Sequence, residues 1–170
     1  MSEKIDMNWE QLTKMSKEVV RDDGPGSATW DPDSSHTKRF NDAFVLEFRA
    51  NQGKIAGELE GFPFMLLTTK GAKTGAERVA PLAYIEIDDR MLIIASMGGA
   101  KRNPPWYHNL VKNPQVGVEV GAESFEAQAV VTEGADREEL FRRVVELFPI
   151  FGEYQERTER TIPVVELKRI

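Results

Sequence analysis

Two glycine turns that hold cations are the most chemically suggestive feature of this sequence. The first, GAKTG, spans residues 71–75 and carries Lys73 at its tip, with Arg78 just beyond it. The second reads MGGAKRN over residues 97–103 and directly follows Ser96. Each follows a predicted strand, where a sheet protein presents backbone amides and charged side chains to a ligand. Cations at such turns, above all the forked guanidinium, indicate a site for phosphate or carboxylate.

The charge of this stretch supports an anionic small molecule as the ligand. Residues 64–113 hold seven Lys/Arg against four Asp/Glu, a local net charge of +3 within a chain of net charge −6. The acidic balance of the whole chain argues against nucleic acid, whose binding domains usually present a basic face. The turns match neither the Walker phosphate loop nor the GxGxxG dinucleotide fingerprint, so folds built on those motifs are not supported.

Aromatic and amide side chains follow the second turn. Trp106 starts a predicted helix and is either a core residue or a platform for a planar heterocycle. Asn103 and Asn109 supply amides that suit ring carbonyls or phosphate oxygens, although Asn103 equally fits a helix N-cap. Ser96 ends a predicted strand, so we expect its hydroxyl to lie near whatever the second turn holds.

Groups that transfer protons are scarce in the chain. It contains no cysteine and two histidines, which leaves no thiolate nucleophile and no obvious Ser/His/Asp set, and we predict no metal site. Near the C terminus, Tyr154 follows an apolar run at 148–151 that is either core or the wall of a substrate pocket. This composition suits chemistry that a bound cofactor performs.

The elements that position these residues predict one α+β domain. Strands are expected at 63–69, 77–87, 91–97, 115–120, 124–132 and 161–170. The connections at 88–90 and 121–123 are short enough for hairpin turns, so their neighbouring strands should be antiparallel. Helices are expected at 1–20, at 37–51, from Asn103 onward and at 136–148. Strands joined mostly by tight turns, with helices gathered at the ends, indicate a small antiparallel barrel.

The first 20 residues form a predicted amphipathic helix, with apolar residues at helical spacing. Its apolar face either packs on the body of the protein or lies on a membrane or a partner. No apolar run approaches the ~18 residues needed to span a bilayer. The N terminus also lacks the pattern of a secretory signal. We therefore expect a cytoplasmic protein, free or at the inner face of the cell membrane.

Four segments, in this order, resemble the actinobacterial deazaflavin-dependent nitroreductase family, whose coenzyme is F420, an 8-hydroxy-5-deazaflavin. They read EFRANQGKIAG (47–57), LLTTKGAKTGAERVAPLAY (66–84), ASMGGAKRNPPWYHNLVKNPQVGVEV (95–120) and ERTIPVVEL (159–167). The resemblance covers residues 40–170 and leaves residues 1–39 as an N-terminal extension. It implies a split antiparallel β-barrel, related to flavin-binding barrels, with flanking helices.

The resemblance also implies a coenzyme site that uses both turns. The phosphate and acidic tail of F420 would lie at Lys73, Thr74, Arg78 and Pro81. The ring system would lie along Ala95, Ser96, Met97, Gly98, Gly99 and Ala100, with Asn103, Trp106 and Asn109 completing the wall. Met97 departs from the family pattern, which usually has lysine there. Phe151, Tyr154 and Arg157 stand where the best-known nitroreducing members carry three tyrosines.

We therefore expect an oxidoreductase that transfers a hydride from reduced F420 to a hydrophobic, electron-poor acceptor such as a quinone, rather than to a nitro drug. Ser96 and Tyr154 are the expected catalytic contacts, because either hydroxyl can hydrogen-bond an acceptor oxygen as negative charge develops there. Two alternatives stay open: an FMN-dependent enzyme on a similar barrel, and a coenzyme-binding carrier without turnover.

Overall fold

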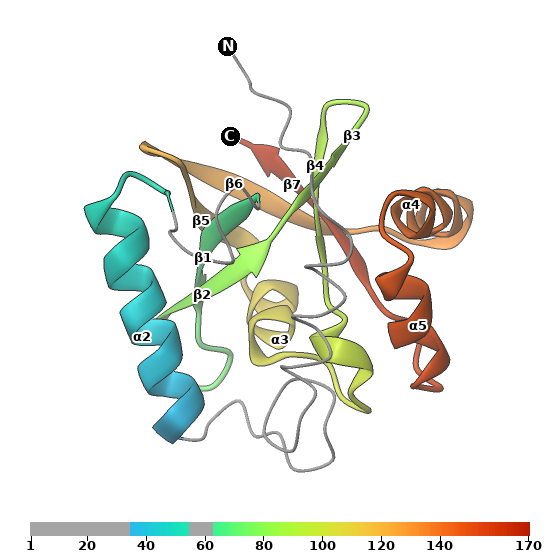
Figure 1. The fold of residues 1–170 in the computed structure, drawn as a ribbon, viewed down its shortest axis with the longest axis horizontal. Coiled ribbons are helices and arrows are strands. Elements are labelled where there is room, and N and C mark those ends of the chain that lie inside the picture. Colours follow the sequence, from blue (N-terminus) through green and yellow to red (C-terminus); the bar gives the residue numbers. More distant parts are fainter. Residues whose placement is uncertain (1–34, 55–62) are drawn as a thin grey trace.

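The computed structural model describes residues 35–54 and 63–170, which form a curled sheet with helices against it (Figure 1). None of the helices in this part of the chain is long and apolar enough to cross a membrane. The helix predicted at 1–20, and any membrane contact through it, lie outside the described residues.

One sheet of seven antiparallel strands forms the centre of the protein. The strands are β1 (Phe64–Lys70), β2 (Glu77–Ala83), β3 (Ile85–Ile87), β4 (Arg90–Ile94), β5 (Gln115–Val120), β6 (Glu123–Val131) and β7 (Val164–Arg169). Their spatial order is β2-β1-β5-β6-β7-β4-β3. Consecutive strands β2 and β3 therefore lie at opposite edges. The sheet has to curl back on itself for the chain to join them.

The single strand predicted at 77–87 is wrong, because the chain changes its pairing partner after Tyr84. The Tyr84 amide donates to the carbonyl of Pro63 (3.0 Å). Residues before it pair with β1 and residues after it pair with β4. This change of partner makes seven strands from the predicted six. It also produces the curled half-barrel, which confirms the expected α+β fold with a split antiparallel barrel.

Four helices pack on this sheet: α2 (Ser35–Ala50), α3 (Pro105–Lys112), α4 (Gly134–Leu147) and α5 (Ile150–Glu156). Helix α2 ends as predicted, at Gly53 with a φ of 82°. A Cβ there would lie 2.4 Å from the Cα of Gly121, so only glycine fits. Helix α5 was not predicted: Pro149 ends α4 as expected, but it also caps the start of a further helix.

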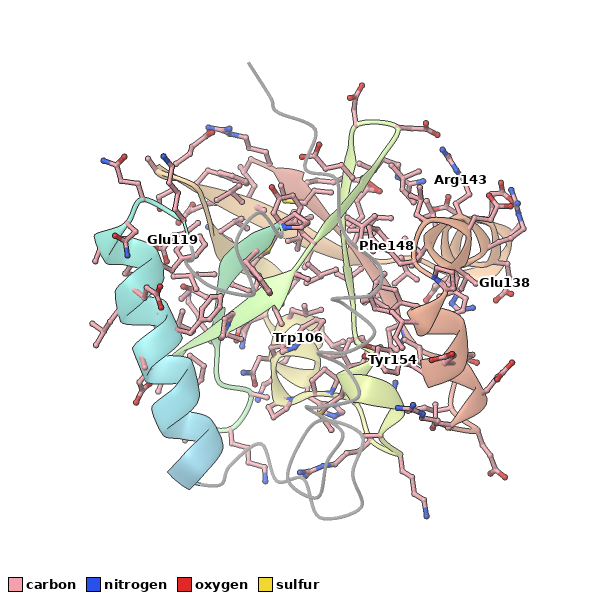
Figure 2. All side chains as sticks on the ribbon, viewed as in Figure 1. Trp106, Glu119, Glu138, Arg143, Phe148 and Tyr154 are labelled. Carbon is pink, nitrogen blue, oxygen red and sulfur yellow. The ribbon has the colours of Figure 1, made fainter. Side chains whose placement is uncertain are left out.

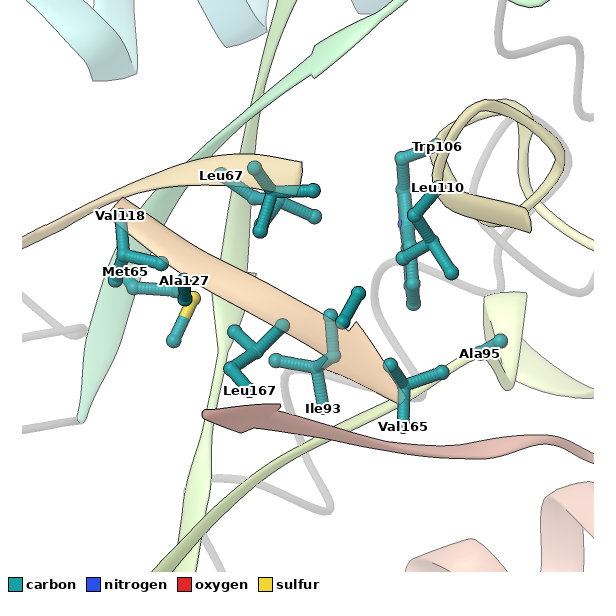
Figure 3. Close-up of a cluster of buried hydrophobic side chains, with 12 residues drawn as sticks. Met65, Leu67, Ile93, Ala95, Trp106, Leu110, Val118, Ala127, Val165 and Leu167 are labelled. Atoms are coloured by element: carbon teal, nitrogen blue, oxygen red, sulfur yellow. The ribbon is translucent and has the colours of Figure 1, made fainter. Parts of the chain in front are cut away.

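The core inside the half-barrel fixes α3 to the sheet. Alternate strand residues share one face, because side chains in a strand point to opposite sides in turn. Those facing inward include Met65, Leu67, Ile93, Val116, Val118, Val165 and Leu167. Trp106 and Leu110 point from α3 into this cluster (Figure 3). Burying an apolar side chain of this size contributes about 1.5–3 kcal/mol, so α3 is held firmly.

The outer face of the sheet carries the remaining helices. Helix α2 packs Phe44 and Phe48 against Leu66 of β1. Helix α4 covers the other end of the sheet, where Leu140 and Val144 join residues of β3, β4 and β7. Figure 1 shows α3 between these two flanks. The helix that carries most of the predicted wall residues thus has a fixed place on the concave side.

Candidate functional site

The first glycine turn has a backbone closed by its own hydrogen bonds. The amide of Gly71 donates to Ala76 O (2.7 Å), and the amide of Gly75, at a φ of 72°, donates to Gly71 O (2.8 Å). The hydroxyl of Thr74 accepts from the Ala76 amide (3.2 Å). Lys73 and the other residues at the tip are exposed. The turn therefore presents its cation to solvent from a defined backbone.

Helix α3 holds this turn from behind. The side-chain oxygen of Asn109 accepts from the Ala72 amide (2.9 Å), and its nitrogen donates to the Thr69 hydroxyl (3.1 Å). Lys112 donates to Ala72 O (2.6 Å). Asn109 is 8% exposed. Both ends of its amide are occupied inside the protein, so it orients the turn.

The second glycine turn, η2 (Met97–Gly99), has an uncommon backbone. Met97, Gly98 and Gly99 have φ values of 46°, 64° and 84°. A left-handed φ is readily adopted by glycine but costs energy for methionine. Two hydrogen bonds close the turn, from Gly99 N to Ser96 O (2.9 Å) and from Ala100 N to Met97 O (3.1 Å). The structure thus keeps a strained residue where the sequence predicts the ring site.

Both turns offer backbone donors. Within the described residues, the amides of Lys73 and Thr74 in the first turn donate to no acceptor, and neither do those of Met97 and Gly98 in the second. A buried amide such as that of Gly98 normally has a partner, because leaving it unpaired costs free energy. Donors of this kind, beside exposed cations, suit an anionic ligand with ring oxygens.

Arg160 is the residue that sequence reasoning missed. Its Nε donates to Ala100 O (2.8 Å), one terminal nitrogen to Ala95 O (3.1 Å) and to the Asn103 side chain (2.8 Å), and the other to Ser96 O (2.8 Å). Partial burial lowers the pKa of Arg160, although arginine stays charged in proteins. The only signal in the sequence was its place in the segment ERTIPVVEL.

Helix α5 brings the C-terminal candidates to the second turn. A Cβ on Gly99 would lie 2.6 Å from Tyr154 O and 2.9 Å from the Cβ of Arg157, so helix and turn are in contact. Arg157 lies over the Tyr154 ring (5.5 Å) and donates to Gly98 O (3.4 Å). Phe151 meets Tyr154 edge-on at 5.9 Å. Figure 2 shows Tyr154 on the side of α5 turned towards the body of the protein.

The remaining predicted residues differ in exposure. Arg78 is exposed on β2 and Pro81 is half-buried on the same strand. Ser96, at 8% exposed, is buried at the entry to η2, directly after buried Ala95. Trp106 is 9% exposed and lies in the core, which favours the core interpretation of that ring (Figure 3).

The two turns are linked to opposite ends of α3, which lies near the centre of Figure 1. Asn103, just before the helix, is bonded to Arg160 beside η2, whereas Asn109 and Lys112 near its end hold the first turn. The helix has 8 residues, so at 1.5 Å per residue it is ~12 Å long. An elongated ligand with an anionic end and a ring end matches this separation. Among the described residues no group of His, Asp or Glu is arranged to hold a metal ion.

The fold alone does not define an activity, but the sequence of the chain assigns it to a family. The chain belongs to the F420H(2)-dependent quinone reductase family, whose family model matches residues 39–169. The protein is therefore an F420-dependent reductase. Coenzyme F420 is its cofactor. Membership of this family confirms the expected coenzyme and the expected type of reaction. The family description names quinone reduction, whereas the resemblance in the sequence named nitroreductases.

Individual relatives agree with this assignment. An F420H(2)-dependent quinone reductase of Mycobacterium tuberculosis is 41% identical over 135 residues, which cover 77% of this chain and 89% of that protein. A solved F420-H2 dependent reductase is 38% identical, with a TM-score of 0.56, over 62% of this chain and 94% of its own. A second solved chain, described as a domain-swapped dimer, is 34% identical, with a TM-score of 0.59, over 79% and 98%.

Proposed function

We propose that one molecule of reduced F420 binds along α3, with its acidic tail at the first turn and its ring at η2. We further propose that a quinone-like acceptor lies between that ring and α5. The bound coenzyme supplies the hydride. The contribution of the protein is to bind, orient and polarise the two reactants.

The first turn is the proposed tail site because it combines exposed cations with free amides. Lys73 and Arg78 are both exposed, so their charges can reach a phosphate or carboxylate from solution. The amides of Lys73 and Thr74, which have no acceptor within the described residues, add neutral donors. Charge-assisted contacts of this kind are about twice as strong as neutral hydrogen bonds. Solvent exposure makes them sensitive to salt.

The second turn is the proposed ring site because of its two glycines, both of which are buried in this structure. Gly98 and Gly99 carry no side chain that would stand between the ring and the backbone. The amides of Met97 and Gly98 have no acceptor in the part of the chain that the structure describes, and we assign them to ring oxygens. Ser96 lies at the start of this turn, and Asn103 is attached to it through Arg160. Trp106 and Asn109 support the site indirectly. Trp106 fixes the position of α3 in the core, and Asn109 fixes the first turn.

The proposed acceptor site is the face of α5 that carries Tyr154 and Arg157. Hydride transfer places two electrons on the quinone, so one of its oxygens becomes negative and then takes a proton from solvent. The Tyr154 hydroxyl can donate a hydrogen bond to that oxygen, and the guanidinium of Arg157, beside Gly98 O, adds a positive charge. Phe151 supplies an apolar wall next to the Tyr154 ring.

The observation that carries this proposal is the contact of α5 with η2 at Gly99. This contact brings the Tyr154 backbone and the Arg157 side chain against the turn proposed for the ring. The test is anaerobic stopped-flow mixing of the enzyme–reduced F420 complex with a water-soluble naphthoquinone, followed at the coenzyme absorbance. We expect rapid single-turnover oxidation. Tight F420 binding without oxidation by any quinone would instead favour a carrier.

Residues 40–170 are the proposed catalytic domain and residues 1–39 an N-terminal extension. Quinones of biological membranes are apolar, so an amphipathic helix at 1–20 would bring a cytoplasmic enzyme to its acceptor at the inner membrane surface. Vesicle sedimentation of the full chain and of a chain lacking residues 1–20 tests this. Equal sedimentation of both would exclude a membrane role for the segment.

A further inference from the structure

Arg160 contacts the second turn on both sides. Ala95 O and Ser96 O precede the left-handed residues, Ala100 O follows them, and all three accept from the Arg160 guanidinium. The same group donates to Asn103, which leads into α3. One planar side chain therefore spans the whole turn and ties it to the helix proposed to support the coenzyme.

The turn needs such support because its backbone is strained. Met97 has a φ of 46° and is followed by two more residues of positive φ. Conformations of this kind persist only where the surrounding structure over-determines them. The two hydrogen bonds inside the turn are local, whereas the four bonds from Arg160 come from a residue about 60 positions later in the chain.

Arg160 is itself held in place by α4 and α5. Its carbonyl accepts from the Gln155 side chain (2.7 Å). The Gln155 oxygen accepts from the Ile162 amide (3.0 Å), and buried Arg137 donates to Ile162 O (2.6 Å). The segment between α5 and β7 is thus anchored at Arg160 and at Ile162. The guanidinium can fix the turn because its own backbone does not move freely.

We propose that Arg160 is a positioning residue that holds η2 in the conformation required for hydride transfer. The inference rests on the proposed function, which puts the coenzyme ring at η2. Arg160 acts on the coenzyme indirectly, through the conformation of the turn, because all three of its guanidinium nitrogens donate to protein acceptors. Lysine cannot replace it, because three donors on one nitrogen do not reach acceptors on both sides of a turn.

The test compares Arg160→Lys and Arg160→Gln with a matched control, Arg90→Gln. Arg90 also donates hydrogen bonds to two partners, Glu166 and Asp136, but on the outer face at the start of β4. Loss of the Arg90 guanidinium therefore destabilises the fold but leaves the hydrogen bonds of η2 in place. If Arg160→Gln fails to fold, Arg160→Lys serves, because it keeps the charge and much of the aliphatic stem.

Two readouts separate positioning from stability. Hydrogen–deuterium exchange of residues 96–103, without coenzyme, should quicken about tenfold or more in the Arg160 variants and stay unchanged in the control. The single-turnover rate at saturating reduced F420 should fall by a factor on the order of ten, the loss expected for charge-assisted bonds. The salt dependence of the F420 dissociation constant should stay that of the wild type, because the first turn is intact.

Each outcome bears on one part of the proposal. Exchange and rate equal to those of the control would overturn it. Faster exchange with a wild-type rate would show that Arg160 holds the turn but that the turn does not set the chemistry, which overturns the positioning role. An enzyme that oxidises no quinone in any form, while exchange still quickens in the variants, would instead contradict the proposed function.

Discussion

Gly99 sits at the tightest contact of the proposed site, so Gly99→Ala tests how α5 and η2 meet. A Cβ at this position would lie 2.6 Å from a backbone oxygen and 2.9 Å from the Cβ of Arg157. Neither atom is the end of a flexible side chain. The φ of 84° adds a second cost, because a side chain is strained in that region. Helix and turn must therefore move apart.

The two costs can be separated by a matched variant. Gly134→Ala has a similar φ of 58° but nothing within 4 Å of the added Cβ, so it carries the backbone cost alone. That cost is about 1–2 kcal/mol. Gly99→Ala adds overpacking of about 1–3 kcal/mol, for a total of about 2–5 kcal/mol. The difference between the variants is the contribution of the contact.

The assay is urea denaturation of both variants, with the single-turnover rate measured on the folded proteins. We expect Gly99→Ala to lose more free energy of unfolding than Gly134→Ala. It should also slow hydride transfer, because Tyr154 and Arg157 shift with α5, whereas Gly134→Ala should react at the wild-type rate. Equal stability losses would refute the reasoning, since they would mean that α5 does not pack on the turn as described.

Three further predictions concern the coenzyme tail, the acceptor and the N terminus. Lys73→Ala and Arg78→Ala should each weaken F420 binding about tenfold or more, by loss of a charge-assisted contact, with little change in the rate at saturation. Calorimetry at two salt concentrations checks this, and unchanged dissociation constants would leave the turn without a binding role. Tyr154→Phe should keep the F420 dissociation constant and lower quinone turnover by a factor on the order of ten; a wild-type rate with every active quinone would make the tyrosine a packing residue. A chain lacking residues 1–20 should fold and bind F420, as fluorescence titration can test; a folded chain that does not bind would place the segment in the site.

Local patterns in the sequence predicted most of the fold. The hairpin turn at Asp88 and Asp89 follows from its length, and both residues take the positive φ that such turns need. The helix ends at Gly53 and Pro149 follow from the backbone properties of those residues. The glycine turns lie at the strand ends where the sequence predicts them. Each of these features depends on neighbouring residues only.

The features that sequence reasoning missed depend on contacts between distant residues. The run of strand-forming residues is divided at Tyr84, because its amide makes the last bond to the segment of β1, at Pro63, and Ile85 already pairs with β4. In the sequence, nothing distinguishes Arg160 from the other cations. In the fold, four acceptors surround its guanidinium. Asn109 reads as a ligand contact, and the structure occupies both ends of its amide with Thr69 and Ala72. No local periodicity carries such information.

The most direct test of the central claim is an NMR titration of the 15N-labelled protein with F420. If one coenzyme spans α3, the amides of Lys73 and Thr74 and those of Met97 and Gly98 should shift together, with a single dissociation constant. Riboflavin, which lacks both the phosphate and the acidic tail, should leave the first pair unmoved. Shifts confined to one turn, or shifts of the two turns at different F420 concentrations, would contradict the account of a single extended site.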